Sequence, residues 1–181
     1  VLTLPAKKLF EIVRALHDTD ITIREEGQGV VKVSADKFES RMQTLPREDF
    51  PTLPEGSAKA VKLPAETLRE MVAKTQFAIT GEDTRYFLNG ALFVLEGDEM
   101  TLVATDGHRL ALVAAKRDKG KTKKDESPRV ILPKKTLWEL GRLLTDDDKE
   151  ISYQQGENHL FFKVAGRVLI SRMIDAQFPA Y

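Results

Sequence analysis

The segment Thr105-Asp106-Gly107-His108 holds the side chains best suited to chemistry. A carboxylate and an imidazole two residues apart could act as acid and base, or bind a metal ion. However, Asp-Gly between two alternating apolar stretches is a strong hairpin signal. The remaining histidines, His17 and His159, add no HxH or HExxH spacing, and the sequence shows no nucleophile elbow or phosphate-binding glycine loop. We therefore expect a turn here, with no catalytic residue, metal or cofactor.

Composition narrows the class of protein. Lysine plus arginine number 28, as do aspartate plus glutamate, and this zero net charge argues against a tight non-specific DNA binder. Without cysteine, disulfides and thiolate metal sites are excluded. Apolar runs such as 110–115 are far too short to span a membrane, and residues 1–5 lack the basic start of a secretory signal. We expect a cytoplasmic protein, and the missing initiator methionine suggests that residues precede Val1.

A short pattern occurs three times along the chain. In each copy a brief apolar segment ends in Leu-Pro and continues into apolar side chains at helical spacing. Proline is favoured at the first position of a helix, where its missing N–H would be unpaired. The Leu-Pro pairs are Leu4-Pro5, Leu63-Pro64 and Leu132-Pro133. We therefore predict helices over 5–16, 64–75 and 133–144.

Strand-like stretches follow each predicted helix. They lie at 21–25, 29–34 and 37–44, at 86–95, 99–105 and 109–115, and at 150–155, 159–164 and 167–174. The first and third copies end alike, with Ser-Arg-Met at 40–42 and 171–173, each followed by Phe-Pro. The repeating unit is therefore a strand, a helix and three strands. This unit predicts an α+β fold with antiparallel sheets and helices on one face.

Two joints separate the three units. Residues 45–59 carry three prolines and suit an interdomain linker, whereas residues 116–128 form a polar, charged loop. One unit is too small to close a core, so the second and third units should pair. We expect a complete domain over 57–181, made of half-modules 60–115 and 129–176. Residues 1–56 would then hold half of another domain, whose partner lies upstream, and the linker.

The segment 104–111, Ala-Thr-Asp-Gly-His-Arg-Leu-Ala, closely resembles the hallmark of the bacterial beta sliding clamp, the processivity subunit of DNA polymerase III. The segments Arg-Tyr-Phe-Leu-Asn-Gly at 85–90 and Phe-Pro-Ala-Tyr at 178–181 resemble that family too, in the same order. The resemblance implies the DNA-clamp fold, with six units in three domains per chain and two chains closing a ring around duplex DNA. This sequence then corresponds to half of the first domain and the whole middle domain, and alone should be monomeric or weakly associated.

The resemblance also implies a site for partner proteins. In that family this turn and the next strand line a shallow apolar pocket for short peptides of DNA polymerases, the clamp loader and repair proteins. Leucine and proline would form its floor, and Arg109 and the turn backbone would donate hydrogen bonds at its rim. The rest of the pocket belongs to a third domain that this sequence lacks. The matching positions are Leu88, Thr105, Gly107, His108, Arg109, Leu110 and Pro179.

The three predicted helices carry eight basic and four acidic side chains, a net charge of +4. Taken alone, they are solvated amphipathic helices. The resemblance implies that they face duplex DNA, where a modest charge neutralises few phosphates and permits sliding. An aromatic pair, Tyr86 and Phe87, would face DNA as well and stack on single-stranded bases. The DNA-facing set is Lys7, Lys8, Arg14, Arg69, Lys74, Arg85, Tyr86, Phe87, Lys134, Lys135 and Arg142.

Two further expectations complete the sequence reading. Strand 37–44 should be a sheet edge, which in the clamp family forms the seam with another subunit. The alternative to a non-enzymatic clamp is a small metal-dependent DNA-processing hydrolase that uses Asp106 and His108. Such an enzyme needs convergent acidic residues and usually a divalent metal, whereas a clamp needs neither.

Overall fold

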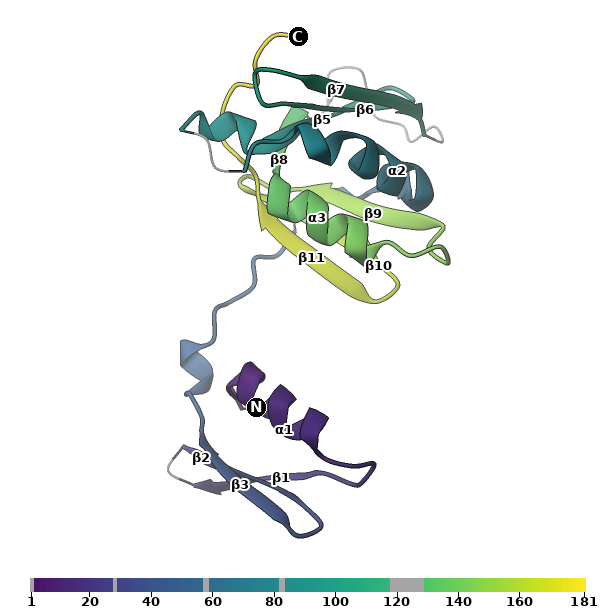
Figure 1. Cartoon of the computed structure of the whole chain (residues 1–181). Coiled ribbons are helices and arrows are strands. Elements are labelled where there is room, and N and C mark those ends of the chain that lie inside the picture. The colour runs from purple at the N-terminus through teal and green to yellow at the C-terminus, as the bar shows by residue number, and fades with distance from the viewer. Residues whose placement is uncertain (1, 28, 57–58, 82–83, 118–128) are drawn as a thin grey trace. The chain divides into compact units, whose positions relative to one another are not determined.

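The computed structural model describes residues 2–27, 29–56, 59–81, 84–117 and 129–181. The chain forms two compact units, Val1–Leu53 and Pro54–Tyr181, and the boundary between them in the sequence falls within the predicted linker (Figure 1). Apart from Lys116 and Arg117, the predicted loop over 116–128 lies outside the described residues. None of the described helices is long and apolar enough to cross a membrane.

The first unit consists of one helix on a three-stranded sheet. Helix α1 (Ala6–Ala15) precedes strands β1 (Thr22–Gly27), β2 (Val30–Ala35) and β3 (Phe38–Gln43), which pair antiparallel in that order. A short 3-10 turn, η1 (Arg47–Asp49), follows. The small core is formed by Val31, Val33 and Met42, with apolar side chains of α1 packed against it. Strand β3 is an edge of this sheet, as the sequence predicts.

The second unit contains two successive half-modules. The first has β4 (Val61–Pro64), α2 (Ala65–Thr75), the 3-10 turns η2 (Gln76–Ala78) and η3 (Tyr86–Leu88), β5 (Gly90–Glu96), β6 (Glu99–Thr105) and β7 (Leu110–Lys116). The second has β8 (Arg129–Pro133), α3 (Lys134–Leu143), β9 (Glu150–Gln155), β10 (His159–Val164) and β11 (Arg167–Arg172). Each half-module is thus a strand, a helix and three strands, which confirms the second and third copies of the repeat predicted from the sequence.

The two half-modules exchange their leading strands. The sheet orders are β7-β6-β5-β8 and β11-β10-β9-β4, so β8 joins the first half-module's sheet and β4 joins the second's. All pairs are antiparallel, with Ala91 opposite Leu132 in one sheet and Leu63 opposite Ile151 in the other. If the two half-modules are interchanged, the strand order of one sheet becomes that of the other. The domain therefore has the topology of two repeats related by an internal two-fold axis.

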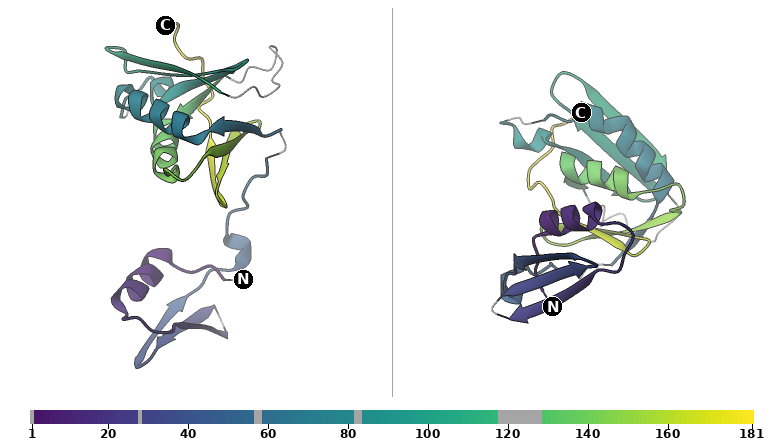
Figure 2. Two further views of the ribbon diagram at one scale, coloured as in Figure 1. Left: turned by 90° about the vertical axis from the view of Figure 1, so that its right-hand side faces the viewer. Right: turned by 60° about the horizontal axis from the view of Figure 1, so that its bottom comes forward.

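Helices α2 and α3 lie side by side and pack on one core shared by both sheets (Figures 1 and 2). Their inward side chains, such as Leu68 and Leu137, are fully buried. Between the sheets, the rings of Phe93 and Tyr153 meet edge to face at 5.7 Å. This is an α+β fold with antiparallel sheets, and its two helices lie together rather than on opposite faces of a sheet.

Two strand predictions are wrong. Residues 86–88 form the η3 turn instead of the start of a strand, because the N–H of Leu88 donates to the carbonyl of Arg85 at 2.8 Å. The Leu88 carbonyl is itself occupied by Thr80, so pairing as a strand starts only at Gly90. The first Leu-Pro segment makes only an isolated bridge, from Thr3 to Leu45. The equivalent segments β4 and β8 each pair with a strand of the other half-module. The first unit contains only one half-module among the described residues, so its Leu-Pro segment has no such strand to pair with.

Candidate functional site

The turn between β6 and β7 is a tight hairpin loop of residues 106–109. Thr105 pairs with Leu110 across it, and Gly107 has a φ of +86°, a conformation that glycine adopts without strain. The Asp106 carboxylate accepts hydrogen bonds from the backbone N–H groups of His108 and Arg109, both at 2.9 Å. The predicted hairpin is confirmed, with a four-residue loop.

Asp106 is therefore held in its ionised form. The backbone N–H of Arg109, followed by that of His108, lowers the pKa of the carboxyl from 3.8 to about 2. A general base works best with a pKa near the operating pH, so this carboxylate is poorly suited to accept a proton in catalysis. Among the described residues, no group of three His, Cys, Asp or Glu side chains could hold a metal ion. The chemistry of Asp106 is that of a turn cap.

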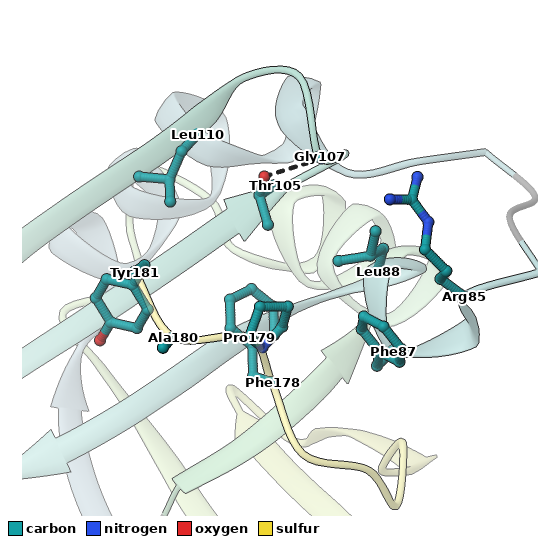
Figure 3. Close-up of a pocket in the computed structure, with 10 residues that line it drawn as sticks. All are labelled: Arg85, Phe87, Leu88, Thr105, Gly107, Leu110, Phe178, Pro179, Ala180 and Tyr181. Carbon is teal, nitrogen blue, oxygen red and sulfur yellow. Dashed lines mark hydrogen bonds between the residues drawn. The ribbon is translucent and has the colours of Figure 1, made fainter.

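A pocket of about 390 Å³ opens beside this turn (Figure 3). Turn η3 forms one end of it, the ends of β6 and β7 form one side, and the segment 178–181 runs along the other. Its lining is mostly apolar, which is typical of a site for a small molecule or a short peptide. The lining residues are Arg85, Phe87, Leu88, Thr105, Gly107, Leu110, Phe178, Pro179, Ala180 and Tyr181.

Five of the seven residues predicted for a peptide pocket line this one. Leu88 is buried, whereas Leu110 has 49% of its surface exposed. The Thr105 hydroxyl donates to the Arg109 carbonyl at 2.7 Å and accepts from the N–H of Gly107 at 3.1 Å. Since these bonds occupy Thr105, it shapes the turn and leaves the apolar side chains to meet a ligand. The five are Leu88, Thr105, Gly107, Leu110 and Pro179.

His108 and Arg109 do not line the pocket. His108 is exposed on the turn. The Arg109 guanidinium donates to the Phe77 carbonyl at 3.0 Å and lies 5.7 Å from the centre of the Phe77 ring. Its Nε also contacts the Asp106 carboxylate at 3.0 Å. Arg109 therefore fastens the turn to η2.

Five lining residues lie outside the set predicted for the pocket. Two of them, Arg85 and Phe87, belong to the predicted DNA-facing set, and the Arg85 guanidinium donates to the carbonyl of Asp106 at 3.3 Å. The other three are Phe178, Ala180 and Tyr181, from the segment whose Phe-Pro-Ala-Tyr motif resembles the clamp family. That motif was the available signal for them.

Lys134 turns inward. Its ammonium donates to the carbonyls of Ile79 and Thr80 at 3.2 and 3.3 Å. Thr80 in turn donates to the carbonyl of the pocket residue Leu88, through its N–H at 3.3 Å and its hydroxyl at 3.0 Å. The start of α3 is thus connected through 79–80 to the turn that carries Leu88.

The other members of the DNA-facing set differ in how their charge is used. Arg69 is paired with Asp146, and Lys74 is paired with Glu70 at 2.9 Å. Lys8 makes one long hydrogen bond, to the Arg41 carbonyl at 3.5 Å. Tyr86 is exposed on η3. Four cations of this set are exposed and have no ionic or hydrogen-bonding partner among the described residues: Lys7, Arg14, Lys135 and Arg142.

The repeated half-modules with exchanged strands and adjacent helices are the architecture of the DNA-clamp fold. Family models agree over nearly the whole chain. The DNA polymerase III beta subunit N-terminal domain matches residues 1–54, and the central domain of the same subunit matches residues 62–180. The chain belongs to the DNA polymerase III beta subunit family, the bacterial sliding clamps.

Individual relatives give the same assignment. The beta sliding clamps of Haemophilus influenzae and Escherichia coli K12 are 37% and 36% identical to 99% of this chain. The chain spans 48% of the length of each, about half of these curated relatives. Solved sliding clamps from Pseudomonas aeruginosa and Bacillus subtilis superpose with TM-scores of 0.86 and 0.90, at 35% and 30% identity. Both matches cover 99% of this chain. The chain spans 48% of the P. aeruginosa clamp and 47% of the B. subtilis clamp. Another P. aeruginosa clamp structure contains bound griselimycin.

Proposed function

We propose that this chain is the part of a sliding clamp that recruits partner proteins through the pocket at 85–110 and 178–181, and that catalyses no reaction itself. In the complete ring it contributes to encircling duplex DNA, which gives DNA polymerase its processivity in the cytoplasm. The partners are polymerases, the clamp loader and repair proteins, each docking a short linear peptide. The ring is a dimer of longer chains, and the edge of β3 is available for a seam between them.

The pocket carries this proposal. Its apolar lining, with Leu88 buried and Leu110 exposed, suits the leucine and phenylalanine side chains of an extended peptide. Arg85 and the turn backbone supply polar groups at its end, which suit a glutamine or a peptide carbonyl. We therefore expect peptides with glutamine followed by leucine or phenylalanine to bind, more weakly than to a complete clamp.

The ionised Asp106 speaks against the hydrolase alternative. Its carboxylate oxygens accept hydrogen bonds from the backbone N–H groups of His108 and Arg109 and from the Arg109 side chain, so they are not free to bind a metal ion. With a pKa of about 2, the carboxylate also takes up no proton near neutral pH. A non-catalytic role for this turn, as one side of the pocket, accounts for the same residues without a proton transfer.

Leu110→Asp tests the pocket. A carboxylate placed in the apolar lining has no partner, and such anchor positions commonly contribute 2 kcal/mol or more, so peptide affinity should fall by about thirtyfold or more. Leu112 is the matched control, because it lies on the same face of β7 with 48% exposure and does not line the pocket. The measurement is a titration of a polymerase-tail peptide followed by backbone amide NMR shifts.

Leu112→Asp should leave the affinity unchanged, and shifts in the wild-type chain should be largest at 85–88, 105–110 and 178–181. Equal losses in both variants, or shifts confined to α1 with none at 105–110, would contradict the pocket assignment.

A further inference from the structure

Two of the three helices carry the same outward-facing pattern. Helix α1 reads Lys-x-x-Phe-Glu-x-x-Arg from Lys7, and α3 reads Lys-x-x-Trp-Glu-x-x-Arg from Lys135. The positions are equivalent when the Leu-Pro starts of the two helices are aligned. Residues at i, i+3 and i+7 share one helix face, so in each copy an aromatic ring lies between two cations. The triads are Lys7, Phe10 and Arg14 in α1, and Lys135, Trp138 and Arg142 in α3.

The aromatic side chains of both triads are exposed. Phe10 has 63% of its surface accessible and Trp138 has 62%, although the opposite face of each helix packs against a core, buried in α3 and partly buried in α1. A large ring left in water at the equivalent position of two separate units serves no core. Exposed aromatic side chains next to cations are a typical feature of surfaces that bind single-stranded nucleic acid.

The cations of both triads are available to a ligand. Lys7, Arg14, Lys135 and Arg142 have no ionic or hydrogen-bonding partner in the described part of the chain. The equivalent positions of α2 are Glu66, Arg69 and Ala73, and there the arginine is already paired with Asp146. The arrangement is therefore specific to α1 and α3.

We propose that the α1 and α3 triads bind single-stranded DNA, with a base stacked on Phe10 or Trp138 and the flanking phosphates held by the two cations. Seven residues of helix separate the cations by about 10 Å, which leaves room for one nucleotide between them. In a duplex the faces of the bases are covered by their neighbours, so the rings favour an unpaired strand. The inference rests on the proposed DNA-facing role of these helices and adds a selectivity for single strands.

The adjacent glutamates limit the strength of this contact. Glu11 and Glu139 follow the aromatic residues and lie at the edge of the same face, so each triad region carries a net charge of only +1. Few phosphates are neutralised, and binding should be weak and reversible and should weaken with added salt. Such a contact can hold an unpaired strand transiently without stopping movement along DNA.

Trp138 reports directly on the contact, because it is the only tryptophan in the chain. Titrating the whole chain with a thymidine oligonucleotide at low salt should quench the Trp138 fluorescence to a plateau, since a stacked base quenches an indole. A duplex of the same length should bind to the chain, measured by anisotropy of a labelled strand, with little quenching. Replacing Trp138 by leucine and Phe10 by tryptophan together moves the reporter to α1, where the same quenching is expected.

Affinity measurements on variants complete the test. Trp138→Leu and Phe10→Leu together should weaken single-strand binding about fivefold or more, as removal of both stacking platforms does, and leave duplex binding within twofold. Arg142→Ala should weaken binding of both forms. Lys163→Ala is the charge control, because Lys163 is exposed on β10, outside both triads, and it should change neither.

The outcomes separate this inference from the proposed function. Duplex binding that persists without any Trp138 quenching by the single strand would overturn the stacking contact and leave the DNA-facing helices intact. Failure of both DNA forms to bind at low salt would overturn both. Equal quenching by single strand and duplex would show that the rings contact DNA without selectivity, and would also overturn the inference.

Discussion

The sequence around Asp106 is compatible with two different roles, a catalytic acid–base residue and a turn residue. Beside His108 it has the spacing of an acid–base pair, and before Gly107 it has the spacing of a turn. The structure decides through two hydrogen bonds of 2.9 Å from backbone N–H groups, which stabilise the charged carboxylate. A carboxylate stabilised in this way helps to fix the turn at the side of the pocket. Its pKa is too low for it to accept a proton near neutral pH.

Acid should loosen the turn by protonating Asp106. Since its pKa in the folded chain, about 2, is below the ordinary 3.8, ionisation stabilises the folded turn fully above pH about 4. That contribution is lost as the pH falls through about 2. Amide hydrogen exchange at His108 and Arg109, followed from pH 5 downward by NMR at matched intrinsic rates, should accelerate in this window. Asp106→Asn should remove the transition, and an unchanged transition in this variant would assign it to another carboxyl.

Lys134 lies next to Lys135 in the sequence but serves a different purpose. Lys134→Met keeps the aliphatic stem and removes the bonds to the carbonyls of Ile79 and Thr80, so the free energy of unfolding should fall by about 1.5–3 kcal/mol. Peptide affinity should fall too, because Thr80 holds Leu88. Lys135→Met, at an exposed position with no partner among the described residues, should change stability by less than about 0.5 kcal/mol. Denaturant unfolding measures both. If Lys134→Met instead weakened DNA binding and left the stability unchanged, Lys134 would be a DNA contact, as the sequence predicts.

At the scale of the element, the helices were predictable and the partners of the strands were not. Leu-Pro followed by apolar residues at helical spacing placed α2 and α3 to within one residue at each end. The same pattern gave no sign that β4 would leave its own half-module and pair with β9. Strand pairing is decided by contacts distant in sequence, such as that between Leu63 and Ile151, which local periodicity does not encode.

Alanine substitutions at two glycines, one in a sheet and one in a helix, should change the stability of the fold in opposite directions. In Gly90→Ala the added methyl group would overlap the Leu132 carbonyl oxygen and lie 2.9 Å from Ile131, where β5 meets the exchanged strand β8. Backbone cannot move aside easily, so stability should fall by about 3 kcal/mol. In Gly141→Ala the methyl group lies 3.7 Å from Val72, and stability should rise by up to about 1 kcal/mol. Thermal unfolding measures both, and a harmless Gly90→Ala would show that β8 does not approach β5 so closely.

For the molecule as a whole, the sequence predicts the pocket residues that lie within local motifs but not those that the fold brings in from elsewhere in the chain. Leu88, Thr105 and Leu110 lie in motifs that resemble the family, and all three line the pocket. Arg109 belongs to the same motif, yet it is drawn to Phe77, a residue 32 positions away that no local pattern connects to it. Phe178 and Tyr181 reach the pocket because the chain returns past β8 after β11, which is a property of the fold rather than of any segment.

Duplex binding by the whole chain should be weak, and its affinity should fall steeply as the salt concentration rises. Each phosphate neutralised contributes about 0.9 to the slope of log affinity against log salt. Of the predicted DNA-facing cations, Arg69, Lys74 and Lys134 are already engaged. The four that have no partner among the described residues, Lys7, Arg14, Lys135 and Arg142, should give a slope with a magnitude of about 4. Anisotropy of a labelled linear duplex across a salt series measures it.

Two substitutions on the adjacent helices α2 and α3 make this prediction specific. Arg142→Ala should reduce the slope by about 1, since an unpaired cation is lost. Arg69→Ala should leave it nearly unchanged, because Asp146 already neutralises that guanidinium. If both variants reduce the slope equally, the Arg69–Asp146 pair opens to bind phosphate. If the wild-type chain instead binds linear duplex at nanomolar concentration without regard to salt, the chain reads specific features of DNA and the sliding interpretation of its helices is wrong.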